Sequence, residues 1–194
     1  MPSIAAIFDL DNTLLNDASG RLFFQYLRRS GEFSHFFRLR NVWTVASAAL
    51  LLRLGIFDLT QAMRRSAAVA AGTGLDEMDT VVRRWFEEMV VHHISVAGRE
   101  RLDWHRMQEH IPVICSGASQ FSVLPVARYL GIEHNVHTEW LSKDGYLTGD
   151  IRQPIVYGAG KVYWMQKWAA EHKVNLAQSY WLMLKECAKR QFWK

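Results

Sequence analysis

The stretch Ile-Ala-Ala-Ile-Phe-Asp-Leu-Asp-Asn-Thr, residues 4–13, decides the fold, because an apolar run ends there in two carboxylates. Residues 4–8 include β-branched side chains, which predicts a strand buried on both faces, as in parallel sheets. A second apolar run covers residues 111–115 and is followed by small residues, Ser116, Gly117, Ala118 and Ser119. Together the two runs predict an α/β fold whose open parallel sheet binds ligands at the carboxyl ends of its strands.

Asp9 and Asp11 stand two residues apart, directly after the first predicted strand. Two carboxylates at close range disfavour each other's ionisation, and a bound Mg²⁺ removes that difficulty. One carboxylate can then attack a phosphorus atom as a nucleophile, while its neighbour protonates the leaving oxygen. A calcium loop is excluded, because Thr13 and Leu14 stand where such a loop needs a carboxylate or amide and then a glycine. A lone Asp-x-Asp pair is more often a cap or a turn, but the buried strand before it and the motifs after it favour catalysis.

This pattern, Asp-x-Asp-x-Thr after a first strand, resembles the haloacid dehalogenase-like superfamily of phosphohydrolases, and within it the branch that contains phosphoserine phosphatase. The resemblance covers about residues 4–179 and three of the four family motifs in order. It implies that Asp9 is the nucleophile and a Mg²⁺ ligand. It also implies that Asp11 is the general acid and base and binds the metal through its backbone carbonyl, and that Thr13 supports the phosphate-binding loop. Dehalogenases lack the second aspartate, so Asp11 favours phosphoryl chemistry.

The second and third family motifs are matched by Ser116-Gly117 and by Lys161. A hydroxyl and backbone N–H groups at the start of a helix suit phosphate oxygens, so Ser116 and Gly117 are expected to bind the substrate phosphate. Lys161 can offset the repulsion between Asp9 and the phosphate, and is expected to contact both. A nucleotide-binding loop is excluded at this Gly-Ala-Gly-Lys segment, because Val162 replaces the required Ser or Thr. Taken alone, the two motifs are typical of a strand end and of a solvated lysine, and their order after Asp9 gives them weight.

The fourth family motif, small residues and an aspartate that holds Mg²⁺, has no match in this sequence. No aspartate follows Asp150, and Glu186 lies among Leu, Lys and Trp residues. The abrupt change after Tyr180 predicts a frameshift, an alternative end or a truncation that leaves the C-terminal part of the core altered. Residues 151–194 carry eight Lys and Arg against two Glu, so the basic excess lies in this region. We therefore expect weak metal binding and impaired turnover.

A long helical segment separates the two predicted strands. Ser19 is predicted to cap a helix that ends near Gly31, and another helix is predicted from about Asp76. The resemblance implies that this segment forms a helical cap, inserted after the first strand of a Rossmann-like core. The expected division is a hydrolase core at residues 1–15 and 96–180, a cap at 16–95, and an atypical basic tail at 181–194. The remaining predicted elements are helices over 121–130 and 161–172, a hairpin over 137–151 with its turn at Lys143-Asp144-Gly145, and a strand over 176–184.

Composition limits the classes of function. The chain has 194 residues, of which 49% are apolar and 22% charged, and this predicts one globular core. Cys115 and Cys187 cannot form a disulfide scaffold, and Asp9 interrupts the apolar stretch at the start of the chain, so a cytoplasmic location is expected. Residues 41–52 are apolar but too few to span a membrane. The basic flanks of residues 42–52 leave contact with a membrane surface open, although burial in the cap explains this stretch at least as well. No zinc finger or RNA-binding signature occurs, and nucleic acid is not an expected partner.

Two further groups of residues are expected to be inert. Cys115 precedes Ser116 and should point to the opposite face of its strand, as a buried core thiol. His92 and His93 are adjacent and do not share a helix face, which argues against a metal role.

We interpret the sequence as a Mg²⁺-dependent phosphatase that hydrolyses a small phosphomonoester through an aspartyl-phosphate. Two alternatives stay open. The same residues serve a phosphotransferase, in which a second substrate replaces water. The missing acidic motif also suits a catalytically inactive remnant that binds phosphate or a protein partner.

Overall fold

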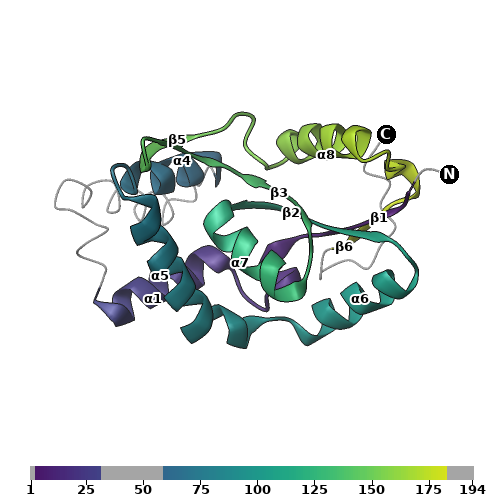
Figure 1. Ribbon diagram of the computed structural model, residues 1–194, viewed down its shortest axis with the longest axis horizontal. Helices are drawn as coiled ribbons and strands as arrows, with labels where there is room; N and C mark the ends of the chain where they lie inside the picture. Colours follow the sequence, from purple (N-terminus) through teal and green to yellow (C-terminus); the bar gives the residue numbers. More distant parts are fainter. Residues whose placement is uncertain (1–2, 32–58, 183–194) are drawn as a thin grey trace.

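A parallel sheet of four strands forms the centre of the computed structural model, which describes residues 3–31 and 59–182 (Figure 1). The strand order is β3-β2-β1-β6, and all neighbouring pairs are parallel. The strands are β1 (Ala5–Phe8), β2 (Ile111–Ser119), β3 (His134–Thr138) and β6 (Tyr180–Leu182). This confirms the predicted α/β class and the Rossmann-like parallel sheet.

Both faces of β1 are covered, as its uninterrupted apolar sequence requires. Ala6 and Phe8 belong to the larger apolar core, which includes side chains of α6 (Val96–Met107) and α7 (Gln120–Leu130). Ala5 and Ile7 face the other way and pack with α8 (Ala159–Glu171). In Figure 1, α6 and α8 lie on opposite sides of the sheet. The four residues of β1 are at most 1% exposed.

Three details differ from the sequence-based expectations. The second strand continues past Cys115 to Ser119. The strand β3 was not expected, because its sequence His-Asn-Val-His-Thr is largely polar and carries no alternating pattern. The strand expected over residues 176–184 begins only at Tyr180, because Leu176–Gln178 forms a short 3-10 helix (η4) whose start is capped by Asn175.

The helices that follow β1 gather at one end of the molecule (Figure 1). They are α1 (Ser19–Ser30), α4 (Leu59–Val69) and α5 (Leu75–Glu88), followed by a 3-10 helix η3 (Val90–His93). The two connections to the core run side by side: the Asn16 amide donates to the His93 carbonyl at 2.8 Å, and the Ser95 amide donates to the Leu14 carbonyl at 2.9 Å. The division at residues 15 and 96 stays a prediction, and residues 42–52 lie outside the described part of the chain.

A two-stranded hairpin, β4 (Trp140–Lys143) and β5 (Tyr146–Ile151), lies above the core in Figure 1. Its turn contains Asp144 and Gly145, both with positive φ, as predicted for a tight hairpin. Backbone hydrogen bonds join β5 to the turn between α4 and α5: the Gly72 amide donates to the Leu147 carbonyl at 2.7 Å, and the Leu147 amide donates to the Thr73 carbonyl at 2.9 Å. The hairpin is distant in sequence from the helical segment that follows β1, and these backbone hydrogen bonds attach the two to each other.

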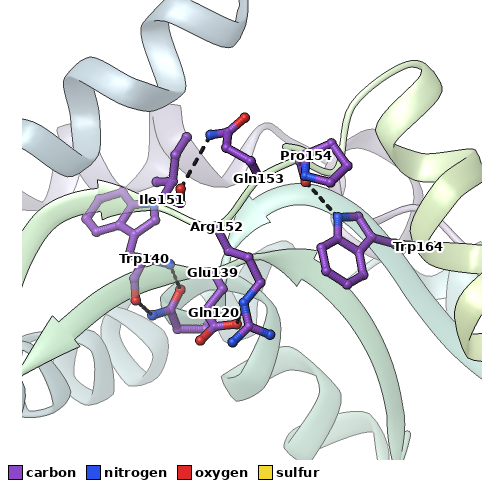
Figure 2. Close-up of polar contacts among 8 residues, drawn as sticks. All are labelled: Gln120, Glu139, Trp140, Ile151, Arg152, Gln153, Pro154 and Trp164. Atoms are coloured by element: carbon purple, nitrogen blue, oxygen red, sulfur yellow. Dashed lines mark hydrogen bonds and ion pairs between the residues drawn. The ribbon is translucent and has the colours of Figure 1, made fainter.

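The base of the hairpin is fixed to the core by side chains (Figure 2). The amide group of Gln120, at the start of α7, both donates to the Trp140 carbonyl and accepts from the Trp140 amide, each at 2.9 Å. Glu139 and Arg152 form an ion pair at 3.0 Å across the two ends of the hairpin.

None of the helices in the described residues is long and apolar enough to cross a membrane.

Candidate active site

Asp9 lies directly beyond the end of β1, at the carboxyl edge of the sheet. Its Oδ1 accepts a hydrogen bond from the Leu10 amide at 2.9 Å, and its own amide donates to the Leu182 carbonyl of β6 at 3.2 Å. The following turn, η1 (Leu10–Leu14), reverses the chain with Asn12 in the left-handed region at φ 54°. The carboxylate is thus presented from the central strand on a turn with a fixed backbone.

Lys161 reaches the same carboxylate from the first turn of α8. Its Nζ lies 3.1 Å from Asp9 Oδ2, and the two side chains are only 17% and 18% exposed. The structure therefore brings together two residues that are 152 positions apart in the sequence. A cation at this place neutralises an anionic nucleophile and remains available to an anionic substrate.

Asp11 is turned toward the start of α1. Its Oδ1 accepts a hydrogen bond from the Ser19 amide at 2.8 Å. Burial raises the pKa of the Asp11 carboxyl above its usual range, and the negative charge of Asp9 adds to this, while the hydrogen bond from the Ser19 amide opposes it. A raised pKa favours the protonated form, which is the form that a general acid needs.

Ser19 differs from its predicted role. The residue at the N-cap of α1 is Ala18, which has no side chain to cap the helix, and Ser19 is the first helical residue. The Asp11 carboxylate takes the place of the cap, because η1 folds it back onto the free amide of Ser19. Sequence reasoning missed this contact, since the carboxylate comes from eight residues upstream.

Ser116 and Gly117 lie within β2, near the edge of the sheet that carries Asp9. They do not lie at the start of a helix as expected, because β2 continues to Ser119 and α7 begins only at Gln120. Phe8 pairs with Ile114, so Asp9 and Ser116 both follow paired residues of adjacent strands. Ser116 is 2% exposed, and its Oγ accepts from the Ala118 amide at 3.2 Å. A Cβ on Gly117 would lie 2.6 Å from Met63 Cε and 3.2 Å from the Val156 carbonyl oxygen, so a larger residue does not fit unless these atoms move.

Met63 is a second residue that the sequence pattern did not single out. It belongs to α4, yet its methyl group touches the backbone of the expected phosphate-binding segment. A methionine on an amphipathic helix carries no signal of such a contact in its spacing.

Thr13 is buried where the turn η1 packs against α6. The residue is 5% exposed, and its carbonyl oxygen would lie only 2.7 Å from a Cβ at Gly98, near the start of α6. This close approach lets α6 pack against η1 and helps to hold the turn that carries Asp11.

The described residues offer few metal ligands. The Asp9 carboxylate and the Asp11 backbone carbonyl are hard oxygen donors of the kind that Mg²⁺ accepts, with waters and a substrate phosphate as its other ligands. Within residues 3–31 and 59–182, no group of three or more His, Cys, Asp or Glu side chains is placed to hold a metal ion. The donor set fits a weakly held magnesium ion, and Glu186 lies outside the described residues.

Cys115 is inert, as expected. It is fully buried on β2 in an apolar cluster with residues of β1 and α8, and burial raises the pKa of its thiol to about 12. Trp181 of β6 packs into the same apolar cluster, and its ring centroid lies 5.8 Å from Lys161 Nζ.

Comparison with known proteins identifies the family of this chain. Residues 6–182 match the model of the haloacid dehalogenase-like hydrolase family. A histidinol-phosphatase of Neisseria meningitidis is 28% identical over 179 residues, which cover 90% of this chain and 78% of that protein. A phosphoserine phosphatase of Mycobacterium tuberculosis is 25% identical over 176 residues, and the aligned part covers 89% of this chain but only 56% of that protein.

Solved structures show the same fold. A protein of unknown function from Bordetella pertussis superimposes with a TM-score of 0.81 at 21% identity, covering 93% of this chain and 82% of that one. A phospho-aspartyl intermediate analogue of phosphoserine phosphatase gives a TM-score of 0.61 at 16% identity, covering 93% and 78% of the two chains. The match to the family model extends over nearly the whole described chain, and the protein belongs to the haloacid dehalogenase-like hydrolase family.

Proposed function

We propose that the chain hydrolyses small phosphomonoesters through a phosphate ester of Asp9. The observation that carries this proposal is the partly buried contact between Asp9 Oδ2 and Lys161 Nζ, with Asp11 two residues further along the chain. The names of the two bacterial relatives, histidinol-phosphatase and phosphoserine phosphatase, support the reaction class.

In the first step, an Asp9 carboxylate oxygen attacks the phosphorus atom of the substrate. A bond forms between that oxygen and phosphorus, and the bond from phosphorus to the leaving oxygen breaks. Asp11 gives its proton to the leaving oxygen, which departs as an alcohol. Lys161 and the Ser116-Gly117 segment hold the phosphate oxygens and offset the repulsion between two anions.

In the second step, a water molecule attacks the phosphorus of the aspartyl-phosphate. Asp11, now ionised, takes a proton from this water as the new bond forms. The bond between phosphorus and Asp9 then breaks, which releases inorganic phosphate and restores both carboxyl groups.

Mg²⁺ is the cofactor that we propose, held by the Asp9 carboxylate and the Asp11 carbonyl. Bound there, it would neutralise charge on the phosphoryl oxygens. We propose further that residues 16–95, together with the β4–β5 hairpin, act as a cap that keeps bulk water from the site until the first step is complete.

The test is to trap the intermediate. The protein is incubated with Mg²⁺ and 4-nitrophenyl phosphate, histidinol phosphate or phosphoserine, quenched in acid, and treated with hydroxylamine. We expect release of phosphate and an aspartyl hydroxamate at Asp9 by peptide mass spectrometry. Hydrolysis without any adduct at Asp9 would contradict the mechanism.

The two alternatives give different outcomes in the same assay. A phosphotransferase passes the phosphoryl group to an added alcohol, so the alcohol phosphate exceeds inorganic phosphate among the products. An inactive remnant binds phosphate but releases no alcohol from any of the three substrates. The described residues offer few ligands for Mg²⁺, and this observation favours the second alternative.

A further inference from the structure

The side chain of Gln120 joins the β4–β5 hairpin to the core (Figure 2). Its Nε2 donates to the Trp140 carbonyl, and its Oε1 accepts from the Trp140 amide, each at 2.9 Å. The side-chain amide therefore exchanges both hydrogen bonds with one residue, as a paired residue of a neighbouring antiparallel strand does. Because Trp140 is the first residue of β4, this pair fixes the point at which the hairpin leaves the core.

Gln120 is also close in sequence to the expected phosphate-binding segment. It is the first residue of α7, and β2, which contains Ser116 and Gly117, ends one residue earlier. The ring of the next residue, Phe121, packs edge-on against Trp140 at 5.7 Å between ring centroids. The start of α7 thus holds Trp140 by two hydrogen bonds and a ring contact.

The hairpin in turn packs against α4. Trp140 and Met63 of α4 lie against the same small apolar cluster, whose buried members are Ala67, Ile151 and Ile155. Met63 Cε lies where a Cβ on Gly117 would be only 2.6 Å away. The contacts therefore run from Gln120 to Trp140, through the cluster to Met63, and from Met63 back to β2.

We infer that Gln120 is a positioning residue for the proposed site: by holding Trp140, it keeps α4, and with it the Met63 methyl group, against the backbone at Gly117. The inference rests on the proposed function, in which Ser116 and Gly117 bind the substrate phosphate. A segment that is held in place before the ligand arrives loses less freedom on binding, which favours affinity. Gln120 itself is assigned no contact with substrate.

Gln120→Leu tests this role, since it removes both hydrogen bonds and keeps a side chain of similar size. The phosphate is held alike before and during the reaction, so a displaced segment should weaken binding and leave the chemical step almost unchanged. With 4-nitrophenyl phosphate, we expect KM to rise about tenfold and kcat to stay within about twofold of the wild-type value.

A second variant at the same position guards against a failure of Gln120→Leu to fold. Gln120→Glu has nearly the same shape and keeps an oxygen that accepts from the Trp140 amide. Its other oxygen replaces the donor, so it faces the Trp140 carbonyl without a hydrogen bond. We expect KM to rise in this variant as well, again with little change in kcat.

Ser179→Ala is the matched control. The Ser179 hydroxyl also makes two hydrogen bonds to the backbone: it accepts from the Ala5 amide at 3.0 Å and donates to the Asn175 carbonyl at 2.7 Å. These bonds lie where β1 begins, at the opposite edge of the sheet from Asp9. Their loss should lower stability and leave KM unchanged. An unchanged KM in both Gln120 variants, or an equal rise in Ser179→Ala, would overturn the inference.

A second measurement does not depend on turnover. In protein labelled with ¹³C at its methionine methyl groups, the Met63 methyl should show a nuclear Overhauser effect to the Gly117 protons in the wild type and in Ser179→Ala, but not in Gln120→Leu. The affinity for inorganic phosphate, followed in the same spectra, should fall about tenfold in Gln120→Leu alone.

The two signals separate the inference from the function on which it rests. Absence of the Met63 effect in the wild type, or its persistence in Gln120→Leu, would overturn the inference. A wild-type chain that binds no phosphate and hydrolyses no ester would count against the proposed function, while the Met63 signal still decides whether Gln120 holds α4 in place.

Discussion

At the scale of single residues, Asp9 is the group on which the proposed reaction depends. Asp9→Asn removes the nucleophile but keeps an oxygen that can accept from the Leu10 amide. We expect the hydrolysis of 4-nitrophenyl phosphate to fall by more than about 10³-fold, and the covalent adduct to disappear. Asp103→Asn, at an aspartate of α6 whose side chain is 63% exposed, should leave the rate unchanged. Turnover by Asp9→Asn at the wild-type rate would exclude this residue as the nucleophile.

Gly117 offers a test of the contact between α4 and the phosphate-binding segment. An alanine Cβ would lie 2.6 Å from Met63 Cε, so Gly117→Ala must displace Met63 or distort β2. We expect kcat/KM to fall about tenfold, since small misplacements at a reacting centre are costly. Met63→Ala frees the space, so the double variant should regain most of the loss. Additive effects in this double-mutant cycle would show that the two residues do not contact each other in solution.

Some residues of the site can be proposed from the sequence, and others cannot because their contacts join distant segments of the chain. Asp9, Asp11, Ser116 and Lys161 could be proposed from sequence, because each follows an apolar run or precedes a recognisable helix. Ser19 and Met63 could not, since their contacts depend on how separate segments pack. A serine before a helix is normally a cap, and here Ala18 takes that position because the Asp11 carboxylate already satisfies the helix start.

At the scale of elements, the attachment of the hairpin to α4 rests on a glycine. Gly149 of β5 has φ 88°, and a Cβ there would lie 3.3 Å from the Ala68 Cα in α4 and 2.9 Å from the Ala71 Cβ just after that helix. Gly145 in the turn has a similar φ of 83° but open space around it. Gly145→Ala should therefore destabilise the fold by about 1–2 kcal/mol through backbone strain alone. Gly149→Ala should cost a further ~1–3 kcal/mol through overpacking.

Urea denaturation of the two glycine variants measures the difference. Equal losses of the free energy of unfolding would mean that β5 and α4 do not pack closely in solution. Because the two glycines have similar φ angles, the difference between the variants reports on the contact between the elements.

Buried strands are easier to predict from the sequence than half-buried ones. The strands β1 and β2 are apolar on both faces, and their sequences therefore carry a strong signal. The edge strand β3 is half-buried along its length and contains two histidines and an asparagine, so nothing in its sequence separates it from a loop. Its strand structure comes from pairing with β2, which local sequence does not encode.

At the scale of the whole molecule, buried histidines make the fold sensitive to acid. His105 Nδ1 lies 2.8 Å from His110 Nδ1, and the two rings pack with Tyr180 of β6. Burial, together with the nearby charges of His110 and Arg101, lowers the pKa of His105 to about 4. Burial beside Arg152 also lowers the pKa of His137 to about 4.

The sign of the pH effect follows from these values. In the unfolded chain a histidine takes up its proton near pH 6.5, whereas in the folded chain His105 and His137 do so only near pH 4. The stabilisation is therefore present above about pH 6.5 and is lost as the pH falls toward 4. We expect Tm to decrease across this window, and to decrease less in His105→Asn, which keeps a polar group near the position of Nδ1. An equal slope in the variant would show that His105 does not titrate on unfolding.

The small number of ligands for Mg²⁺ in the described part of the molecule predicts a high Mg²⁺ requirement. Mg²⁺ prefers six oxygen ligands, and the proposed site would supply one carboxylate and one carbonyl, so water and substrate would provide the rest. No group of three or more His, Cys, Asp or Glu side chains is placed to hold a metal within the described residues. Loss of supporting groups around a metal typically costs 10- to 100-fold in affinity or activity, and loss of a direct carboxylate ligand should cost at least as much. No aspartate follows Asp150, and Lys185, Lys189 and Arg190 add positive charge after β6.

We therefore expect this chain to need at least ~10- to 100-fold more Mg²⁺ for half-maximal hydrolysis of 4-nitrophenyl phosphate than the Neisseria histidinol-phosphatase assayed beside it. The Mg²⁺-induced rise in Tm should shift to higher concentration in the same proportion, which separates weak binding from slow chemistry. Equal Mg²⁺ requirements in the two proteins would mean that another group of this chain already serves as the missing ligand.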